Sequence, residues 1–412
     1  MRQILVLALF FSAAHAFAGF SAGAAKAKMT PDVSDAANPV WLAGYQGGRA
    51  ATGVHDDLWI TALAMNHDQG SVLFITVDLI GYMFDEVAEV KNLIHKELDI
   101  APSKIFIFST HNHSGPDSIG LWGKDGKTGK DQAYLDSLRR KILACAGEAV
   151  KSMKPVRAVF GKTRYDNPIE DSRPPKIIND LLLSMKLTDM EGHTIATLVN
   201  YAMHAEVLNG KNTLLTSDYP GVLREQLEKK LGGVAIYITG DIGGMQSPFV
   251  LFHTFWSRER VGKALAVQVL QSLMGKLPEE VPYLRAHASE ILFPIENKRY
   301  IQAIESGMFG RSSQFIQKAG DKYFLPADVA FVQIGPAQFI TVPGEAFPEV
   351  GNVLRGKMAQ DYPFVLGLAN NEIGYIVPDD QWNDSGYEEN MSLGPQTTKT
   401  LLKAVSELLD KI

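Results

Sequence analysis

Residues 105–122 read IFIFSTHNHSGPDSIGLW, an apolar run that ends in two histidines and a Ser-Gly-Pro turn. The β-branched and aromatic residues predict a buried strand over 104–110. Side chains two residues apart on a strand point to the same face, so His111 and His113 would leave the strand end together. Such a pair can bind a metal, or can divide the roles of ligand and acid/base. Taken alone, a His-x-His pair is more often structural, and the rest of the chain has to decide.

Strands and helices alternate on both sides of this stretch. The run SVLFITVDL at 71–79 predicts a buried strand, and residues 84–98 predict a helix with one apolar face. Further strands are expected at 157–165, 180–187, 194–203, 234–239, 286–293, 329–342 and 364–368, and further helices at 132–151, 220–231, 258–274, 347–358 and 397–409. This alternation predicts an α/β fold, a layered mixed sheet flanked by helices on both faces of a single large domain. The irregular segment 296–323 is interpreted as an insertion or a lid.

Composition and charge narrow the class of protein. The chain has 412 residues, 46% of them hydrophobic and 21% charged, which is typical of a globular protein with a large core. The net charge is −6 and no block of lysine and arginine stands out, so we expect no nucleic-acid partner. Cys145 is the only cysteine. It can form no intrachain disulfide and is expected to be a small buried residue.

The N-terminus has the pattern of a signal peptide. Arg2 precedes an apolar run at 4–11, and Ala14-His15-Ala16 supplies the small-x-small cleavage pattern. We therefore expect residues 1–16 to be removed near Ala16 and the protein to be exported, periplasmic or secreted. Residues 17–42 begin with an Ala/Gly/Lys tract and are interpreted as a low-complexity, extended segment. The folded domain is expected to span 43–412.

Reactive residues follow several other predicted strands. Ligand sites of α/β proteins gather outside strand ends, so this recurrence is informative. His204 ends the strand at 194–203 and is a candidate second metal ligand. Glu345 follows Pro343-Gly344; it either stabilises a helix dipole or serves as a third ligand beside two histidines. Asp218 precedes a helix, where it either caps that helix or orients a histidine.

Two tyrosines lie in polar, glycine-rich segments after the last predicted strand. Tyr375 and Tyr387 either pack in loops, or ligate a metal and donate to an oxyanion. Neither a G-x-S-x-G elbow nor an HExxH motif is present. The residues alone therefore leave a metal site and a structural interpretation open.

With these motifs assembled, the chain resembles the neutral/alkaline non-lysosomal ceramidase family, over about residues 43–395 and always in the family's N-terminal catalytic domain. Each motif is short, but all of them occur in the family's order. They are Gly44-Tyr45 with Gly53-Val54-His55-Asp56, Thr110-His-Asn-His-Ser-Gly-Pro116, Gly240-Asp241, Pro343-Gly344-Glu345, Gly367-Leu-Ala-Asn370 with Tyr375, and Gly386-Tyr387-Glu388.

The resemblance implies one catalytic Zn²⁺ and assigns roles by motif. The implied zinc ligands are His111, His204, Glu345 and Tyr375. The same resemblance implies that His113 is the acid/base and that Tyr387 contacts the scissile amide. It also implies an active-site arginine between the hallmark and the second zinc histidine. The candidate is Arg173.

These roles predict a zinc-dependent amidohydrolase that cleaves an N-acyl amide, ceramide-like or otherwise, by attack of zinc-activated water. The expected partner is a small-molecule or lipid N-acyl substrate, and peripheral membrane contact is compatible with it. Two alternatives remain at this point. The same site would serve a zinc esterase or phosphoesterase of the cell envelope, and the fold would also serve an inactive module that binds a lipid or glycan.

Overall fold

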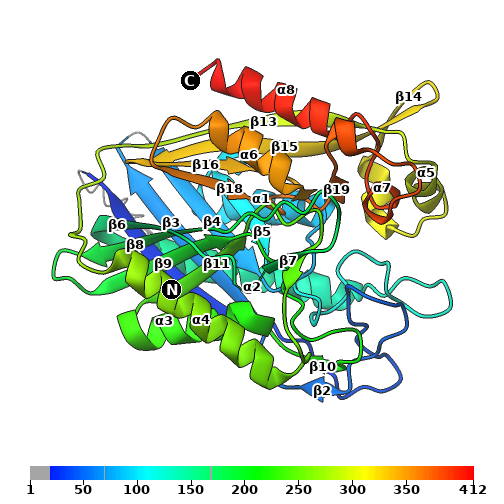
Figure 1. The fold of residues 1–412 in the computed structure, drawn as a ribbon, viewed down its shortest axis with the longest axis horizontal. Helices are drawn as coiled ribbons and strands as arrows, with labels where there is room; N and C mark the ends of the chain where they lie inside the picture. Colours follow the sequence, from blue (N-terminus) through cyan, green and yellow to red (C-terminus); the bar gives the residue numbers. More distant parts are fainter. Residues whose placement is uncertain (1–18, 69, 168) are drawn as a thin grey trace, which may run out of the picture.

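Two β-sheets lie face to face between two layers of helices (Figure 1). The computed structural model describes residues 19–68, 70–167 and 169–412, so the expected signal peptide lies outside the described residues. The larger sheet has eight strands in the order β11-β9-β8-β6-β1-β3-β4-β5. These strands are β1 (Ser21–Lys28), β3 (Trp59–His67), β4 (Gly70–Val77), β5 (Ile105–Ser109), β6 (Lys154–Arg164), β8 (Leu181–Asp189), β9 (Thr194–Tyr201) and β11 (Val234–Thr239).

The smaller sheet is formed by the C-terminal third of the chain. Its main strands follow the order β13-β15-β16-β18, and β14 pairs with β15. They are β13 (Leu284–Ile295), β14 (Gln317–Ala319), β15 (Lys322–Ile334), β16 (Ala337–Thr341) and β18 (Tyr362–Leu366). Both sheets are mixed. The pairs β4–β5, β9–β11 and β16–β18 are parallel, whereas β1–β3 and β13–β15 are antiparallel.

Aromatic side chains fill the space between the two sheets. Phe74 of β4 packs edge-on against Phe339 of β16 with ring centroids 6.0 Å apart, and Phe339 stacks on Phe364 at 4.3 Å. Phe106 and Phe108 of β5 belong to the same buried cluster. Rings that meet edge-to-face add to the stabilisation from burial. The inner faces of the sheets thus form one continuous core.

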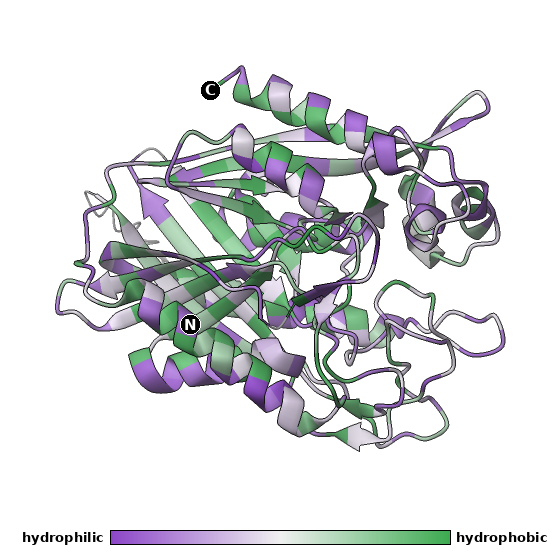
Figure 2. Cartoon of the chain, viewed as in Figure 1, coloured by the Kyte–Doolittle hydropathy of each residue, from purple (hydrophilic) through white to green (hydrophobic). Residues whose placement is uncertain are grey.

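Helices cover the outer face of each sheet. On the larger sheet, α1 (Phe84–Leu98) and α2 (Gln132–Lys151) pack over β3–β5, whereas α3 (Asp218–Leu231) packs over β11 and α4 (Phe255–Leu273) over β6 and β8. On the smaller sheet lie α6 (Pro348–Gly356) and α8 (Thr397–Leu409). Figure 2 shows apolar residues concentrated in the sheets, whereas polar and apolar residues alternate along α8. The predicted layered, mixed α/β fold is confirmed, and the structure adds that its sheet is divided into two.

The N-terminal boundary differs from the prediction. The Ala/Gly/Lys tract forms β1, which pairs along its whole length with β3, from Ser21 opposite Asn66 to Lys28 opposite Trp59. Small residues are required there because α2 lies close: a Cβ on Gly23 would be 2.2 Å from the carbonyl oxygen of Ala149. The folded part therefore begins before residue 43. A composition that looks like a low-complexity segment is the consequence of close helix–sheet packing.

Short elements gather at one end of the sheets and shape the site. The short strands pair as β2–β10, β7–β12 and β17–β19. They are β2 (Gly53–Val54), β7 (Ile169–Asp171), β10 (Leu214–Leu215), β12 (Gln246–Pro248), β17 (Glu345–Ala346) and β19 (Tyr375–Ile376). Two short helices, α5 (Lys298–Glu305) and α7 (Tyr387–Asn390), lie at the same end. Cys145 is buried and free, as predicted. Among the described helices, none is long and apolar enough to cross a membrane.

Candidate active site

Two histidines reach the site from the ends of separate strands. His111 follows β5 with a φ of 59°, and its Nδ1 lies 2.7 Å from the carbonyl oxygen of Ile80. His204 follows β9, and its Nδ1 lies 3.0 Å from the carbonyl oxygen of Gln246. Because a carbonyl can only accept, the hydrogen bond assigns the proton to Nδ1 in each ring. Each Nε2 then presents a lone pair to the interior of the site.

Both Nε2 atoms face the same carboxylate. Oε2 of Glu345 lies 3.1 Å from Nε2 of His204 and 3.4 Å from Nε2 of His111. Burial alone would raise the pKa of Glu345, but the two imidazoles and a hydrogen bond from Tyr375 lower it, so the carboxylate is charged. Burial would likewise lower the pKa of His204, yet the carboxylates of Glu345 and Glu206 raise it. The site therefore favours a positive charge at the point where these three side chains meet.

His113 lies beside this point, but its surroundings differ. Its ring centroid is 4.8 Å from that of His111, and its buried Nε2 has no hydrogen-bonding partner among the described residues. Its Nδ1 lies 3.4 Å from Oε2 of Glu206. Burial and the neighbouring positive groups lower its pKa well below the usual value, which keeps the ring neutral. The ring fits because residue 44 is glycine: a Cβ there would be 2.5 Å from the ring.

The two tyrosines are brought to the same place. β17 and β19 pair in parallel with Glu345 opposite Tyr375. The rings of Tyr375 and Tyr387 are 6.0 Å apart, and Tyr387 begins α7. Tyr375 is buried, whereas Tyr387 is 58% exposed. A buried phenol beside the carboxylate suits a ligand, and an accessible one suits contact with a substrate.

A cavity of about 340 Å³ opens over these residues. The polar side chains that line it are His111, His113, Arg299, Glu345, Glu372, Tyr375 and Tyr387 together with Asn390. The other side chains of the lining are apolar or aromatic: Ile80, Ile119, Leu121, Trp122, Tyr300, Ala303, Phe309 and Met391. The segment interpreted as an insertion or lid, 296–323, supplies four of the lining residues. Such a cavity, polar at one point and apolar elsewhere, fits a ligand with a polar group on an aliphatic chain.

Comparison with known proteins shows which fold this is. No family model matches the chain. Neutral ceramidase B of Dictyostelium discoideum is 24% identical over 148 residues, which make up 32% of this chain and 20% of that protein. The match thus spans about a fifth of the length of this curated relative. The crystal structure of neutral ceramidase from Pseudomonas aeruginosa superposes with a TM-score of 0.78, covering 95% of this chain and 74% of its own at 15% identity. The fold is that of neutral ceramidase.

A second solved structure, a ceramidase complexed with C2, superposes equally well. Its TM-score is 0.77 over 95% of this chain and 75% of its own, again at 15% identity. The resemblance stated from the sequence motifs is therefore confirmed at the level of fold, nearly from end to end. At this identity, it is the arrangement of side chains in this chain that has to carry the chemistry.

Within this ceramidase fold, several groups that could hold a metal ion lie close together. Ligand atoms of His111, His113 and His204 lie within 4.8 Å of one another, and so do those of His111, Glu345 and Glu372. Imidazole nitrogens and carboxylate oxygens are the donors that zinc takes in catalytic sites. Histidine ligands of zinc also donate their other N–H to a carbonyl or carboxylate, as His111 and His204 do here. The donor set fits a bound zinc ion.

Arg173, the candidate active-site arginine, makes its contacts with α7. Its guanidinium donates to Glu388 at 2.7 Å and to Glu389 at 2.6 Å, and it lies over the ring of Phe347. Arg173 is not among the described residues that line the cavity, whereas Arg299 of α5 is. Arg173 thus holds the start of α7, the helix that presents Tyr387.

Two glutamates of the site were missed by the sequence reasoning. Glu372 lines the cavity, and burial together with the nearby Glu345 carboxylate raises its pKa well above the usual value. Glu206 accepts a hydrogen bond from Tyr45 at 3.2 Å and one from Ser247 at 2.5 Å, and it approaches His113. Both lie two residues after a residue that was noticed, Asn370 and His204. Only their burial distinguishes them from surface carboxylates.

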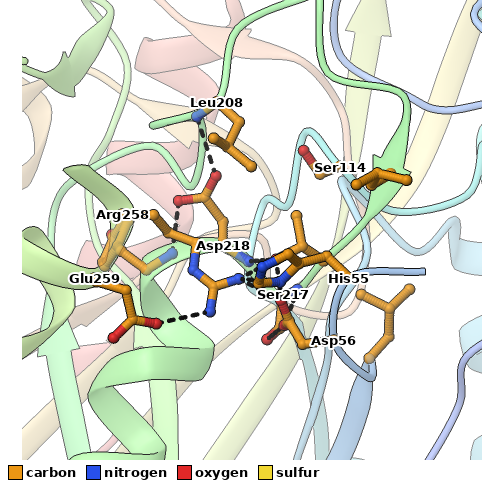
Figure 3. Close-up of polar contacts among 12 residues, drawn as sticks. His55, Asp56, Ser114, Leu208, Ser217, Asp218, Arg258 and Glu259 are labelled. Atoms are coloured by element: carbon orange, nitrogen blue, oxygen red, sulfur yellow. Dashed lines mark hydrogen bonds and ion pairs between the residues drawn. The ribbon is translucent and has the colours of Figure 1, made fainter. Parts of the chain in front are cut away.

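Asp218 supports the loop that follows His204 rather than touching a histidine. Its carboxylate accepts from the backbone N–H of Tyr219 at 2.6 Å and from those of Val207 and Leu208 at 3.4 Å each. Figure 3 shows it beside the contacts of Arg258 with Asp56. Burial raises the pKa of Asp218 to about 6. Two roles were expected for Asp218, capping a helix or orienting a histidine. Ser217 is the N-cap residue of α3, and Asp218 accepts hydrogen bonds from backbone N–H groups instead.

Proposed function

We propose that the protein is a zinc-dependent hydrolase that cleaves the amide bond of an N-acyl substrate. The observation that carries this proposal is the approach of two Nε2 lone pairs to one carboxylate oxygen, at 3.1 and 3.4 Å. In a buried site these three groups need a positive charge among them, which a proton on His204 or a bound metal ion supplies. The ceramidase fold and the names of the relatives support the same conclusion.

His111, His204, Glu345 and Tyr375 would hold the zinc ion. When bound, zinc lowers the pKa of water to about 7 and polarises a carbonyl oxygen. The remaining steps fall to other side chains. His113 is neutral and its Nε2 is unpartnered, so it is able to take a proton from the attacking water. The same nitrogen then delivers that proton to the amine as the C–N bond breaks, because an amide anion cannot leave at neutral pH.

The rest of the cavity positions the substrate. The Tyr387 hydroxyl, at the accessible edge, would donate to the oxygen of the scissile amide while negative charge develops there. The apolar lining would bind the acyl chain and exclude water from it. A substrate with a long acyl chain on an amine fits this division, and ceramide is the candidate that the relatives name. We also propose export, supported by the apolar run at 4–11 and the Ala14-His15-Ala16 pattern.

The decisive experiment measures metal and turnover on the same preparation. The protein, purified from residue 17 onward, is analysed for bound metals and assayed with N-acyl amines of varied acyl length. The expected result is bound zinc and amide hydrolysis that a chelator abolishes and zinc restores. Matched esters and phosphoesters test the esterase alternative. An amidohydrolase cleaves the amide in a way that depends on His113, whereas an esterase or phosphoesterase cleaves only the matched ester or phosphoester. Zinc binding without turnover of any acyl substrate would instead indicate an inactive binding module.

A further inference from the structure

A strongly exposed apolar loop lies outside the cavity, between β12 and the first turn of α4. We call residues 249–256 the apolar loop. Phe249 is 58% exposed, Leu251 84%, Phe252 69% and Trp256 63%. Single exposed apolar residues are ordinary on protein surfaces, but four large ones within eight positions form a patch. Such a patch costs free energy in water and marks a surface that another phase or molecule covers.

The backbone of the apolar loop is held in place, so the exposure does not come from a frayed end. His253 Nδ1 bonds the carbonyl oxygen of Val207 at 2.9 Å. Ser257 Oγ donates to the carbonyl oxygen of Phe252 at 2.6 Å, and Thr254 caps α4 through the N–H of Ser257. The structure therefore fixes the loop with its largest apolar side chains pointing outward.

Basic side chains accompany the apolar ones. Trp256, Arg260 and Lys263 follow one another at helical spacing on one side of α4. The Arg260 guanidinium lies 4.7 Å from the centre of the Trp256 ring. Arg260 and Lys263 are also the charged residues in the lining of a surface groove of about 590 Å³ that Phe249, Leu251 and Phe252 share. Both charged side chains of this groove are basic, and Lys263 also pairs with Glu259 at 2.8 Å.

The apolar loop begins at the same end of the sheets as the candidate site. It follows β12 directly, and Gln246 of β12 supplies the carbonyl oxygen that holds His204. β12 also pairs with β7, which precedes Arg173. A surface that binds at this loop would thus bring the end of the molecule that carries the cavity toward whatever it binds.

We infer that the apolar loop, with Arg260 and Lys263, docks the protein onto the surface of a lipid bilayer that contains anionic headgroups. Tryptophan and phenylalanine favour the boundary between headgroups and acyl chains, and arginine and lysine beside them bind lipid phosphates. The combination of outward aromatic and cationic side chains matches both layers of that boundary. This inference concerns a surface outside the cavity and does not require the proposed hydrolase activity.

Vesicle sedimentation of the whole chain from residue 17 tests the inference. The probes are vesicles of phosphatidylcholine alone and of phosphatidylcholine with phosphatidylglycerol. We expect the protein to sediment with the anionic vesicles, and a Leu251→Ser/Phe252→Ser/Trp256→Ser variant to bind at least about tenfold more weakly. An Arg260→Gln/Lys263→Gln variant should lose the preference for phosphatidylglycerol and the sensitivity to salt.

A matched control comes from the other end of α4. Met274 and Leu277 are 77% and 81% exposed and lie beyond the C-terminal end of this 19-residue helix. A Met274→Ser/Leu277→Ser variant should bind vesicles like the unmodified protein. An unchanged circular dichroism spectrum of the triple variant shows that it is folded.

Three results would overturn the inference. The unmodified protein fails to bind either kind of vesicle, the triple variant binds as tightly as the unmodified protein, or the control variant loses binding equally. Light scattering after gel filtration resolves one further case. A dimer that the triple variant alone disrupts would make this surface an interface between two copies of the chain, and the bilayer would be excluded as its partner.

Discussion

His204 and Glu345 are 141 residues apart in the sequence, yet their Nε2 and Oε2 atoms lie 3.1 Å apart in the buried site. Neither side chain is free to move away. The carbonyl oxygen of Gln246 holds the His204 ring from behind, and the β17–β19 pairing holds the backbone of Glu345. This fixed approach of an imidazole and a carboxylate is the geometry that a metal ion stabilises.

Removal of either side chain should therefore remove zinc. A catalytic site holds about one equivalent of zinc. We expect the Glu345→Gln and His204→Ala variants to retain far less zinc than this and to lose amide hydrolysis. Metal analysis after dialysis against a weak chelator is the measurement. His193→Ala is the matched control, because the exposed His193 belongs to an Asp189–Glu191–His193 cluster that also satisfies metal-ligand spacing. Full zinc in Glu345→Gln would show that the site is assigned wrongly.

His113 should affect turnover without affecting the metal. We expect His113→Asn to keep zinc but to lower kcat for amides by about 10²–10⁴-fold, the usual contribution of a general acid/base. An activated ester with a good leaving group needs no proton on departure, so its hydrolysis should fall less. The measurement is the ratio of amide to ester rates on matched acyl chains. An equal loss on both substrates would contradict the role of proton donor to the amine.

Gly44 tests whether the position of the His113 ring matters. Its φ is 101°, and an added Cβ would lie 2.5 Å from the ring. Gly44→Ala is therefore expected to push the ring away and to lower kcat, with zinc content preserved, because His111 and His204 are held by other contacts. Gly48→Ala, also at positive φ but in contact only with the Lys124 side chain at 3.6 Å, controls for backbone strain. Equal activity losses in the two variants would attribute the effect to strain alone.

The convergence of three candidate metal ligands could be predicted from the sequence because their signals are local. His111, His204 and Glu345 each follow an apolar, β-branched run, and strand ends of an α/β fold meet at one edge. The alternation of helices and strands likewise predicted the layers. The division into two sheets could not be predicted, because which strands share a sheet depends on non-local pairings such as β1–β6, β9–β11 and β13–β15.

The features that were missed depend on contacts across the chain. β1 is a strand because β3 and β6 pair with it and α2 packs on it, whereas its own alanines and glycine favour no strand. Glu372 looks like any surface carboxylate until its burial is known. Arg173 was chosen by its place between two motifs. Its partners, Glu388 and Glu389, lie more than 200 residues away, at separations of 215 and 216.

Arg173 is expected to act on the stability and position of α7. The side chains of Glu388 and Glu389 are 8% and 1% exposed, so loss of the guanidinium leaves two buried carboxylates without their cation. Removal of one partner of a buried ion pair typically costs about 3–5 kcal/mol. We expect Arg173→Ala to lower the free energy of unfolding by a similar amount, measured in urea, and Glu389→Gln in the same chain to recover part of it. A raised KM with unchanged stability would instead support direct contact with substrate.

Asp218 predicts a pH dependence with a definite sign. Burial raises its pKa in the folded protein to about 6, whereas an unfolded aspartate titrates near 3.9. The folded state therefore holds this proton more tightly, and its contribution to stability is present below about pH 4 and lost as the pH rises through about 6. The two-unit difference corresponds to about 3 kcal/mol at most. Asp218→Asn cannot titrate, so the difference in unfolding free energy between variant and unmodified protein should change in favour of the variant between pH 4 and 6 and be constant outside that window. Urea titrations in the presence of a chelator measure it, and a difference that does not vary with pH would show that folding does not raise the pKa of Asp218.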